Sequence, residues 1–299
     1  MTLKDKIENA LNEARILILG GQVLIGAGFR SAFAEGFDKL PYGTRVMEIG
    51  SLWLMTIGLG ILLLPASYHF IVERGENTVS FHELVTSILE WTLFPFAMGL
   101  GVNGFMAGEK VLSPLTGGIE GVLLVLLAVC LWYVFSTVKK RELPRNAHEE
   151  ATSLTDKVKG VLIEARMILP GAQALLGFQI ANTLTDSFDQ LPRASQWAHF
   201  AGLMCIAIST IFLIAPAAYH RIAEHGEDSE EFYNLSGRLL LSGLFWLGLG
   251  ITFDLWIVAR KISHSVLFSY LTSTATLLFF YGLWFGYTTQ KHRQKRRSR

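Results

Sequence analysis

A histidine and a glutamate four residues apart occur twice in this chain, as His69 with Glu73 and as His220 with Glu224. At this spacing two side chains share one face of a helix. Histidine titrates near neutral pH, and a nearby carboxylate shifts that titration. Each pair could therefore carry a proton or take part in binding an ion, provided that the fold places it at a suitable depth.

Each pair belongs to a larger set of polar residues that recurs at a constant offset of 151. Residues 3–76 align with residues 154–227 without a gap, and 26 of the 74 aligned positions are identical. One segment was therefore duplicated and fused. The residues that we consider as a candidate ion or solute site are Glu13, Arg15, Gln22, Tyr68, His69 and Glu73, their mates Glu164, Arg166, Gln173, Tyr219, His220 and Glu224, and also Glu90.

The order of these residues predicts which side chains meet. Glu13 and Arg15 precede the first apolar stretch of the chain, whereas Tyr68, His69 and Glu73 lie at the end of the second. Neighbouring antiparallel helices would bring these two ends together. We therefore expect Arg15 to pair with Glu13 or with the His69 and Glu73 end of the same repeat, and we expect matching pairs in the second copy.

Three interpretations of the clusters stay open. In the first, the ionic pairs only anchor helix ends, where arginine snorkels to the interface and tyrosine joins the aromatic belt. In the second, they form a proton-linked ion or small-solute site. In the third, Zn, Mn or Fe is bound by the side chains of His69, Glu73, Glu76 and Glu13. Gly75 is expected to break the helix before Glu76, and no second histidine is in reach, so we predict no metal site.

Glu90 is the acid that the sequence places inside a span. It lies about six residues into the third apolar stretch, or roughly 9 Å at ~1.5 Å per residue, and the aligned residue is Leu241. A carboxylate at that depth is costly enough to indicate a partner or a role. Coupling sites of secondary transporters tend to lie near the midplane. The other polar residues of the spans fall near the exterior boundary instead of the midplane, which counts against a transporter. They are Arg30, Glu48, Glu120, His199 and Asp254.

The elements that must position these side chains are apolar helices. Of the 299 residues, 51% are hydrophobic and 17% are charged, which is typical of a membrane protein. Apolar stretches at 46–72, 84–107, 116–138, 197–219, 239–259 and 265–288 each exceed the ~20 residues that cross a bilayer. Two further stretches, 16–33 and 167–184, are near the lower limit. The amphipathic residues before them form either an interfacial helix or the first turns of these spans.

Charge asymmetry decides whether the two short stretches count as spans. The linker 139–166 and the tail 291–299 are the most basic segments, and the positive-inside rule puts both in the cytoplasm. With four spans in each copy, 19 of the 26 Lys and Arg residues lie on the cytoplasmic side. The sequence therefore predicts an all-α polytopic membrane helical bundle of eight transmembrane helices. Its two tandem four-helix repeats should be related by a pseudo-twofold axis along the membrane normal, with both termini cytoplasmic.

The predicted units are a first membrane repeat at 1–140, a basic linker at 141–153, a second repeat at 154–289 and a basic tail at 290–299. The linker and tail should attract anionic lipid, whereas a nucleic-acid role is not expected of a membrane protein. Small-x-x-x-small spacings, as at Gly104 and Gly108, pack helices within a chain or between chains. The sequence thus leaves a homo-oligomer open and identifies no protein partner.

The order of motifs resembles a known family. Glu-Ala-Arg, a Gln seven residues after the Arg, Phe-x-x-Leu-Pro and Pro-Ala-x-Tyr-His together resemble an uncharacterised bacterial family of four-span membrane proteins. Some of its members carry a sodium–proton antiporter label. The resemblance covers residues 13–69 and 164–220, so the chain looks like a tandem duplicate. It implies a four-span fold for each half, and we expect a multi-pass protein of the bacterial cytoplasmic (inner) membrane.

Enzyme chemistry finds no support in the sequence. The chain contains no Gly-x-Ser-x-Gly, Walker, His-Glu-x-x-His or Cys-x-x-Cys-His motif, and Cys130 and Cys205 have no partner spacing. We expect neither an enzyme nor a cofactor. The working hypothesis is proton-linked ion or small-solute transport through the paired clusters on the cytosolic side. The alternative is a non-catalytic membrane scaffold or partner-binding module.

Overall fold

The computed structural model describes residues 2–134, 151–225 and 227–297, and every regular element in these residues is a helix. Within these described residues, eight helical runs are long and apolar enough to cross a membrane, judged by length and composition. Four belong to each copy, which confirms the all-α membrane bundle of two four-helix repeats, the two short candidates included. The predicted linker at 141–153 and tail at 290–299 lie partly outside the described residues.

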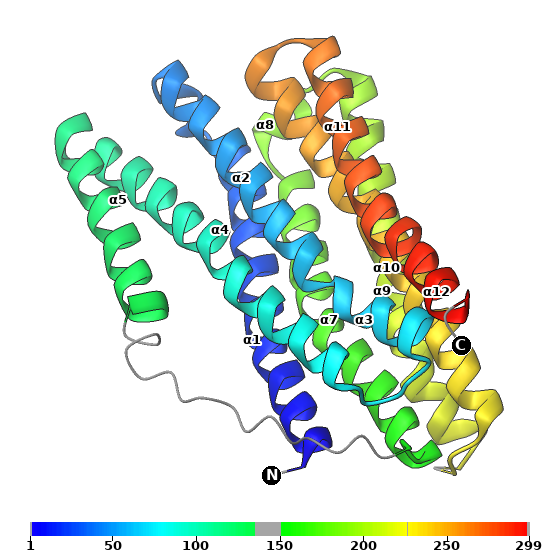
Figure 1. Cartoon of the computed structure of the whole chain (residues 1–299). Helices are drawn as coiled ribbons and strands as arrows, with labels where there is room; N and C mark the ends of the chain where they lie inside the picture. Colours follow the sequence, from blue (N-terminus) through cyan, green and yellow to red (C-terminus); the bar gives the residue numbers. More distant parts are fainter. Residues whose placement is uncertain (1, 135–150, 226, 298–299) are drawn as a thin grey trace.

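The two repeats share an order of elements (Figure 1). The first contains α1 (Leu3–Ala32), the short η1 (Phe37–Lys39), α2 (Tyr42–Leu62), α3 (Leu64–Tyr68), η2 (His69–Glu73), α4 (Val79–Val111), α5 (Pro114–Val129) and η3 (Cys130–Val134). The second contains α7 (Leu154–Thr183), the short α8 (Asp186–Asp189), α9 (Arg193–Ile222), α10 (Glu230–Ser263), α11 (Val266–Tyr281), η4 (Gly282–Tyr287) and α12 (Thr288–Arg297). We call the end of the bundle where α1 begins and α12 ends the terminal end.

Each repeat begins with a 30-residue helix that is longer than its apolar stretch. α1 starts at a capping box, in which the Thr2 hydroxyl accepts from the Asp5 backbone N–H and the Asp5 carboxylate accepts from the Thr2 N–H. The Ser153 hydroxyl caps α7 in the same way through the Asp156 N–H. The amphipathic residues before each apolar stretch are therefore the first turns of the span.

The second span differs between the repeats, although Pro65 and Pro216 are aligned. In the first repeat the α-helix is interrupted at Leu63, and Pro65 lies in the first turn of α3. The backbone then widens into the π-helical turn η2. In the second repeat Pro216 lies inside the unbroken α9. Single π-helical turns are frequent at functional sites, and this one begins with His69.

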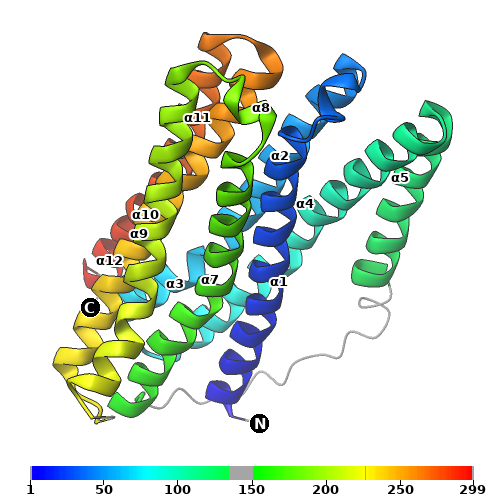
Figure 2. The same cartoon turned by 180° about the vertical axis from the view of Figure 1, so that it is seen from behind.

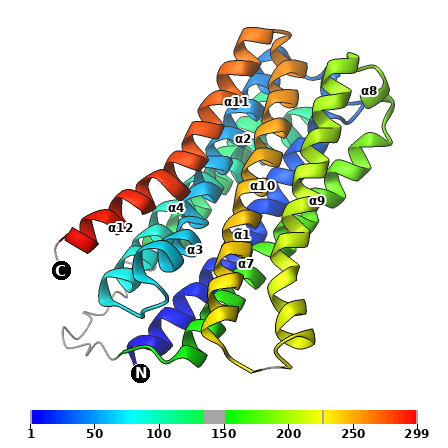
Figure 3. The same ribbon diagram turned by 90° about the vertical axis from the view of Figure 1, so that its right-hand side faces the viewer.

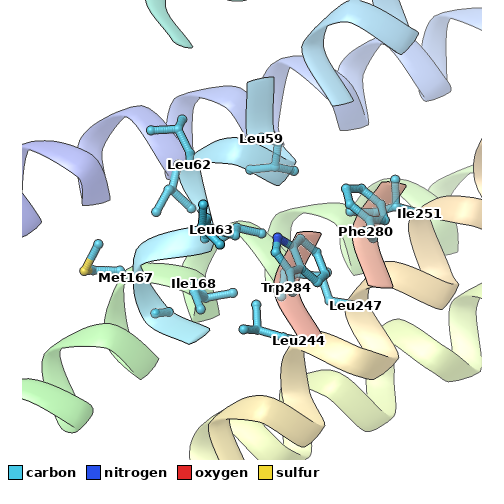
Figure 4. Packing of buried hydrophobic residues seen from close by; sticks show 14 of the residues in the cluster. Leu59, Leu62, Leu63, Met167, Ile168, Leu244, Leu247, Ile251, Phe280 and Trp284 are labelled. Carbon is cyan, nitrogen blue, oxygen red and sulfur yellow. The ribbon is translucent and has the colours of Figure 1, made fainter. Parts of the chain in front are cut away.

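α1 and α7 lie side by side in the bundle, as Figures 1 and 2 show. α10 also joins the repeats, because it packs against α9, α11 and α7 and contacts α2. Figure 4 shows the core at this junction, where side chains from α2, α7, α10, α11 and η4 gather around Leu63 and Trp284. One apolar core therefore extends through both repeats.

The fourth spans break the symmetry. In the second repeat, η4 and α12 pack against α3 and η2 of the first repeat, and the Trp284 indole N–H donates to the Gly60 carbonyl at 2.7 Å. Figure 3 shows α12 continuing the last span past α3. The corresponding α5 packs against α4, and this hairpin diverges from the other helices in Figures 1 and 2. A fourth span thus covers the end of the second span in the first repeat, whereas the same end of the second repeat is more open.

Candidate functional site

A buried histidine–glutamate pair joins the two repeats near the terminal end. His69 Nδ1 lies 2.6 Å from Glu164 Oε1, and the two residues are 4% and 1% exposed. The His69 ring stacks on Phe81, with ring centroids 4.4 Å apart. Within this pair a proton can reside on the imidazole or on the carboxylate. The expectation of pairing within one repeat is wrong here, because the partner of His69 comes from α7 of the other repeat.

Two polar atoms beside the pair are buried and have no hydrogen-bond partner among the described residues. They are His69 Nε2 and the Tyr233 hydroxyl. Tyr233 belongs to α10 and packs its ring against Phe70, which follows His69 in the chain. Buried polar atoms without a partner are rare and call for an explanation. Here they mark a place where the pair could exchange its proton with another group or with water.

The other predicted members of the first cluster divide into a buried and an exposed set. Glu73 is buried and pairs with Lys295 of α12, with Nζ 2.5 Å from Oε2. Tyr68 is buried, and its ring lies near those of Phe81 and Tyr287. Glu13 and Arg15 are exposed on α1. The predicted pairing of Arg15 with Glu13, His69 or Glu73 is absent from the described residues.

Gln22 is completely buried where α1 crosses α7. Its side chain fills the space that a Cβ at Gly171 would occupy, and its amide nitrogen and oxygen have no hydrogen-bond partner in the described chain. A glycine on one helix thus admits a polar side chain from the other, as close helix packing in membranes requires. The aligned Gln173 is exposed, so the two copies of the candidate site place this glutamine differently.

The second cluster keeps the aromatic packing of the first and lacks the pair between repeats. The Tyr219 ring stacks on Phe232 as Tyr68 does on Phe81. His220 is half-buried and lies at ion-pair distance from Asp228, 3.4 Å between Nε2 and Oδ1. Glu224 accepts from the Ser229 hydroxyl at 3.1 Å. Arg166 is exposed.

Glu90 does not lie in the interior. It is exposed on α4, and its backbone carbonyl accepts from the Tyr133 hydroxyl at 2.7 Å. The sequence predicted burial because the residue falls within an apolar stretch. Depth along a helix, however, does not say which face of the helix meets the protein. The diverging α4–α5 hairpin leaves this face on the surface.

Two buried acids far from the terminal end, Glu48 and Asp254, were not among the candidate site residues of the sequence analysis. Glu48 is fully buried beside Ser31, and Asp254 accepts a hydrogen bond from the Gln179 amide at 2.7 Å. His199 Nε2 lies 3.0 Å from the Gln179 carbonyl. Glu48 and His199 occupy aligned positions. A titratable residue at the same position in both copies was the available signal.

Further ion pairs join the repeats at the terminal end. Lys157 Nζ lies 2.6 Å from Glu76 Oε1, and the Thr152 N–H donates to the same carboxylate at 2.9 Å. Partial burial acts to raise the pKa of Glu76, but the hydrogen bonds from Lys157 and Thr152 outweigh it and hold that pKa below its ordinary value.

No group of three His, Cys, Asp or Glu residues in the described ranges is placed to hold a metal ion.

Comparison with known proteins gives a family and no activity. The model of a family described as a family of unknown function (DUF6328) matches residues 3–136 and again residues 148–288. No curated protein and no solved structure matches the chain. The family description names no activity, so it lends no support to an antiporter label. Because the two matches cover most of the sequence, one after the other, the chain belongs to this family of unknown function (DUF6328) as a tandem duplicate.

Proposed function

We propose that this integral membrane protein couples proton movement to the transport of an ion or a small solute, with the His69–Glu164 pair as its proton-carrying group. The observation that carries the proposal is the burial of this pair between the two repeats at 2.6 Å. An anchoring role would place such charges at the surface, where the free-energy cost of a charged side chain is small. Burial of an ionisable pair is expensive, and inside membrane spans it is a mark of function.

Buried polar groups continue from this pair along α7. Glu164 comes first, Gln22 packs at the level of Gly171, and Gln179 contacts Asp254 further on. Glu164 and Gln179 are separated by about 22 Å at ~1.5 Å per residue, with Gln22 roughly midway. These gaps exceed hydrogen-bond reach. A proton could follow this route if water entered between the repeats or if one repeat shifted against the other, as alternating access requires.

We assign the terminal end to the cytoplasm of a bacterial cell, with the protein in the cytoplasmic membrane. The support is the positive-inside rule, since the described parts of the two most basic segments, 151–166 and 291–297, lie at this end. Under this assignment His69 and Glu164 exchange their proton on the cytoplasmic side. A topology reporter fused after Arg299 should then read cytoplasmic, and one inserted near Pro192 should read exterior.

The test is proton flux in proteoliposomes that contain a pH-sensitive dye, after addition of sodium, potassium or other ions and solutes. Glu164→Gln and His69→Gln should abolish most of the flux, because neither variant retains the full proton-sharing pair. The duplication supplies matched controls: Glu13→Gln and His220→Gln change the aligned residues and should leave the flux near the wild-type level.

Two results would overturn the proposal. One is a broad panel that gives no flux with well-folded wild-type protein, which would favour the scaffold or partner-binding module instead. The other is an equal loss of flux in the control variants, which would mean that the buried pair has no special role. Circular dichroism and size-exclusion chromatography of each variant establish that the protein is folded.

A further inference from the structure

A cavity of about 580 Å³ opens at the terminal end between the first repeat and the last helix. Three segments line it: the end of η2 with the turn that leads into α4, the beginning of the second repeat, and α12. The charged or polar residues among them are Glu73, Arg74, Glu76, Asn77, Thr78, Lys157, His292, Lys295 and Arg296. Its volume is in the range of small-ligand sites.

The two carboxylates of this cavity are already paired. Glu73 lies against Lys295 at 2.5 Å and Glu76 against Lys157 at 2.6 Å. In the part of the chain that the structure describes, no carboxylate lies within ion-pair distance of Arg74 or Arg296. Arg74 Nη2 lies 3.3 Å from His292 Nε2. Two guanidinium groups thus give the cavity an excess of positive charge.

The backbone adds to this charge. Thr78 lines the cavity and caps α4, with its hydroxyl accepting from the Phe81 N–H. The positive end of the dipole of a 33-residue helix therefore faces the same space. Arg74 adopts a left-handed conformation with φ 55°, which is uncommon for a residue other than glycine. The turn that carries its side chain to the cavity is thus built at some cost in backbone energy.

The corresponding segment of the second repeat carries the opposite charge. His225 is aligned with Arg74 and is also left-handed, with φ 53°. Acidic residues follow it, with Glu227 and Asp228 before the cap of α10 and Glu230 and Glu231 in the first turn of that helix. The positive cavity is therefore a property of the first repeat together with the basic helix α12, and does not follow from the repeat fold itself.

We infer that this cavity binds a phosphate-bearing anion through Arg74 and Arg296. Arginine offers a planar set of N–H donors that matches phosphate oxygens, and such charge-assisted hydrogen bonds are strong. The anion could be the headgroup of an acidic lipid, since basic clusters at a membrane end attract such lipids, or a soluble phosphate compound. The inference is independent of proton transport, because it uses none of the residues of the His69–Glu164 pair.

The test compares two double variants of the full chain that remove the same charge. R74Q/R296Q removes both guanidinium groups of the cavity, whereas R293Q/R297Q removes two exposed arginines of α12 that do not line it. Binding of inorganic pyrophosphate is measured in detergent. Stabilisation by phosphatidic acid is measured in phosphatidylcholine nanodiscs as a shift of the thermal midpoint.

For the probe that binds, we expect at least ~10-fold weaker binding to R74Q/R296Q than to wild type, and nearly unchanged binding to R293Q/R297Q. Binding of pyrophosphate would indicate a soluble ligand, and an effect of phosphatidic acid alone would indicate a lipid headgroup. Equal losses in both variants would show diffuse attraction to a basic tail and would overturn the inference, as would no binding of either probe or no loss in either variant. If R74Q/R296Q fails to fold, R296Q alone makes the same comparison with R293Q, because Arg296 is exposed.

Discussion

His69 with Glu164 and His220 with Glu13 are equivalent pairs in a duplicated sequence, and the protein forms only the first of them in its described residues. The first pair is buried between repeats at 2.6 Å. In the second, Glu13 is exposed and His220 lies near Asp228 instead. Identical residue types at aligned positions therefore occupy different environments. Duplication has not given this protein two copies of one site.

The fourth spans explain the difference. η4 and α12 pack on the end of the second span that carries His69, through the Trp284–Gly60 hydrogen bond and the Lys295–Glu73 ion pair. The matching α5 packs against α4 and lies away from α9, the helix that carries His220 (Figure 1). Covering one histidine excludes water from it, so the imidazole needs a hydrogen-bond partner inside the protein, and Glu164 supplies that partner. The uncovered histidine needs no such partner.

The two repeats also differ, to a smaller extent, where α1 crosses α7. Phe178 packs into the space at Gly26, whereas the residue aligned with Phe178 is Ala27. Gly177, the mate of Gly26, has no neighbouring atom within 4 Å of a Cβ added there. The contact between the two helices is thus asymmetric at this pair of positions. Gln22 is buried and Gln173 is exposed.

Of the changes that test this difference between the fourth spans, Trp284→Ala should have the largest effect on the free energy of unfolding. The change removes a fully buried indole and its hydrogen bond, so we expect the free energy of unfolding to fall by ~3–5 kcal/mol. The aligned residue is Tyr133, on the diverging hairpin, and Tyr133→Ala should cost less than about 1.5 kcal/mol. Chemical denaturation followed by circular dichroism measures both. Equal costs would mean that the two fourth spans contribute alike, against our explanation.

Gly171→Ala should have a smaller effect of the same kind. A Cβ at this position overlaps the Gln22 side chain, and such overpacking costs about 1–3 kcal/mol of the free energy of unfolding. At the aligned Gly20 nothing lies within 4 Å. Gly20→Ala should be neutral or should stabilise the helix by up to ~1 kcal/mol. A loss of stability in both variants would show that the helix crossing is more symmetric than we describe.

The smallest expected effect is a pH dependence at the Glu76–Lys157 ion pair. The pKa of Glu76 is held below its ordinary value of 4.5 in the folded protein. Its contribution is therefore fully present above about pH 4.5 and is lost as the pH falls through the lower, folded-state value. Because both side chains are partly exposed, the contribution should be below ~1 kcal/mol.

The change Glu76→Gln tests this pH dependence. It should flatten the dependence of thermal stability on pH in the acid range, and Glu227→Gln at the aligned position should not. The same slope in wild type and Glu76→Gln would contradict the role of the ion pair.

The helices could be predicted from the sequence, because length and apolar character identify six of the spans and charge asymmetry decides the two short ones. The constant offset of 151 gave the two repeats, and the basic linker and tail gave the even number of spans. The surroundings of the polar residues were harder to predict. The spacing of His69 and Glu73 says that they share a helix face, but not that the face meets α7 of the other repeat.

Two particular residues show why the rest could not be predicted. Glu90 was expected inside because of its depth along α4, and it lies on the surface because of the direction in which the α4–α5 hairpin diverges. Gln22 and Gln173 are aligned members of the two clusters, yet Gln22 is buried and Gln173 is exposed, and the helix crossing beside them has Phe178 in place of Ala27. Both outcomes depend on how the repeats pack, which local sequence does not encode.

The most direct test of our central claim is infrared difference spectroscopy of the protein across a pH step. If the His69–Glu164 pair gains and loses a proton, the spectrum should contain the C=O stretch of a protonated carboxyl group. We predict that this band disappears in Glu164→Gln and persists in Glu13→Gln. A band that persists in Glu164→Gln, or that is lost equally in both variants, would contradict the assignment of proton carrying to the one buried pair.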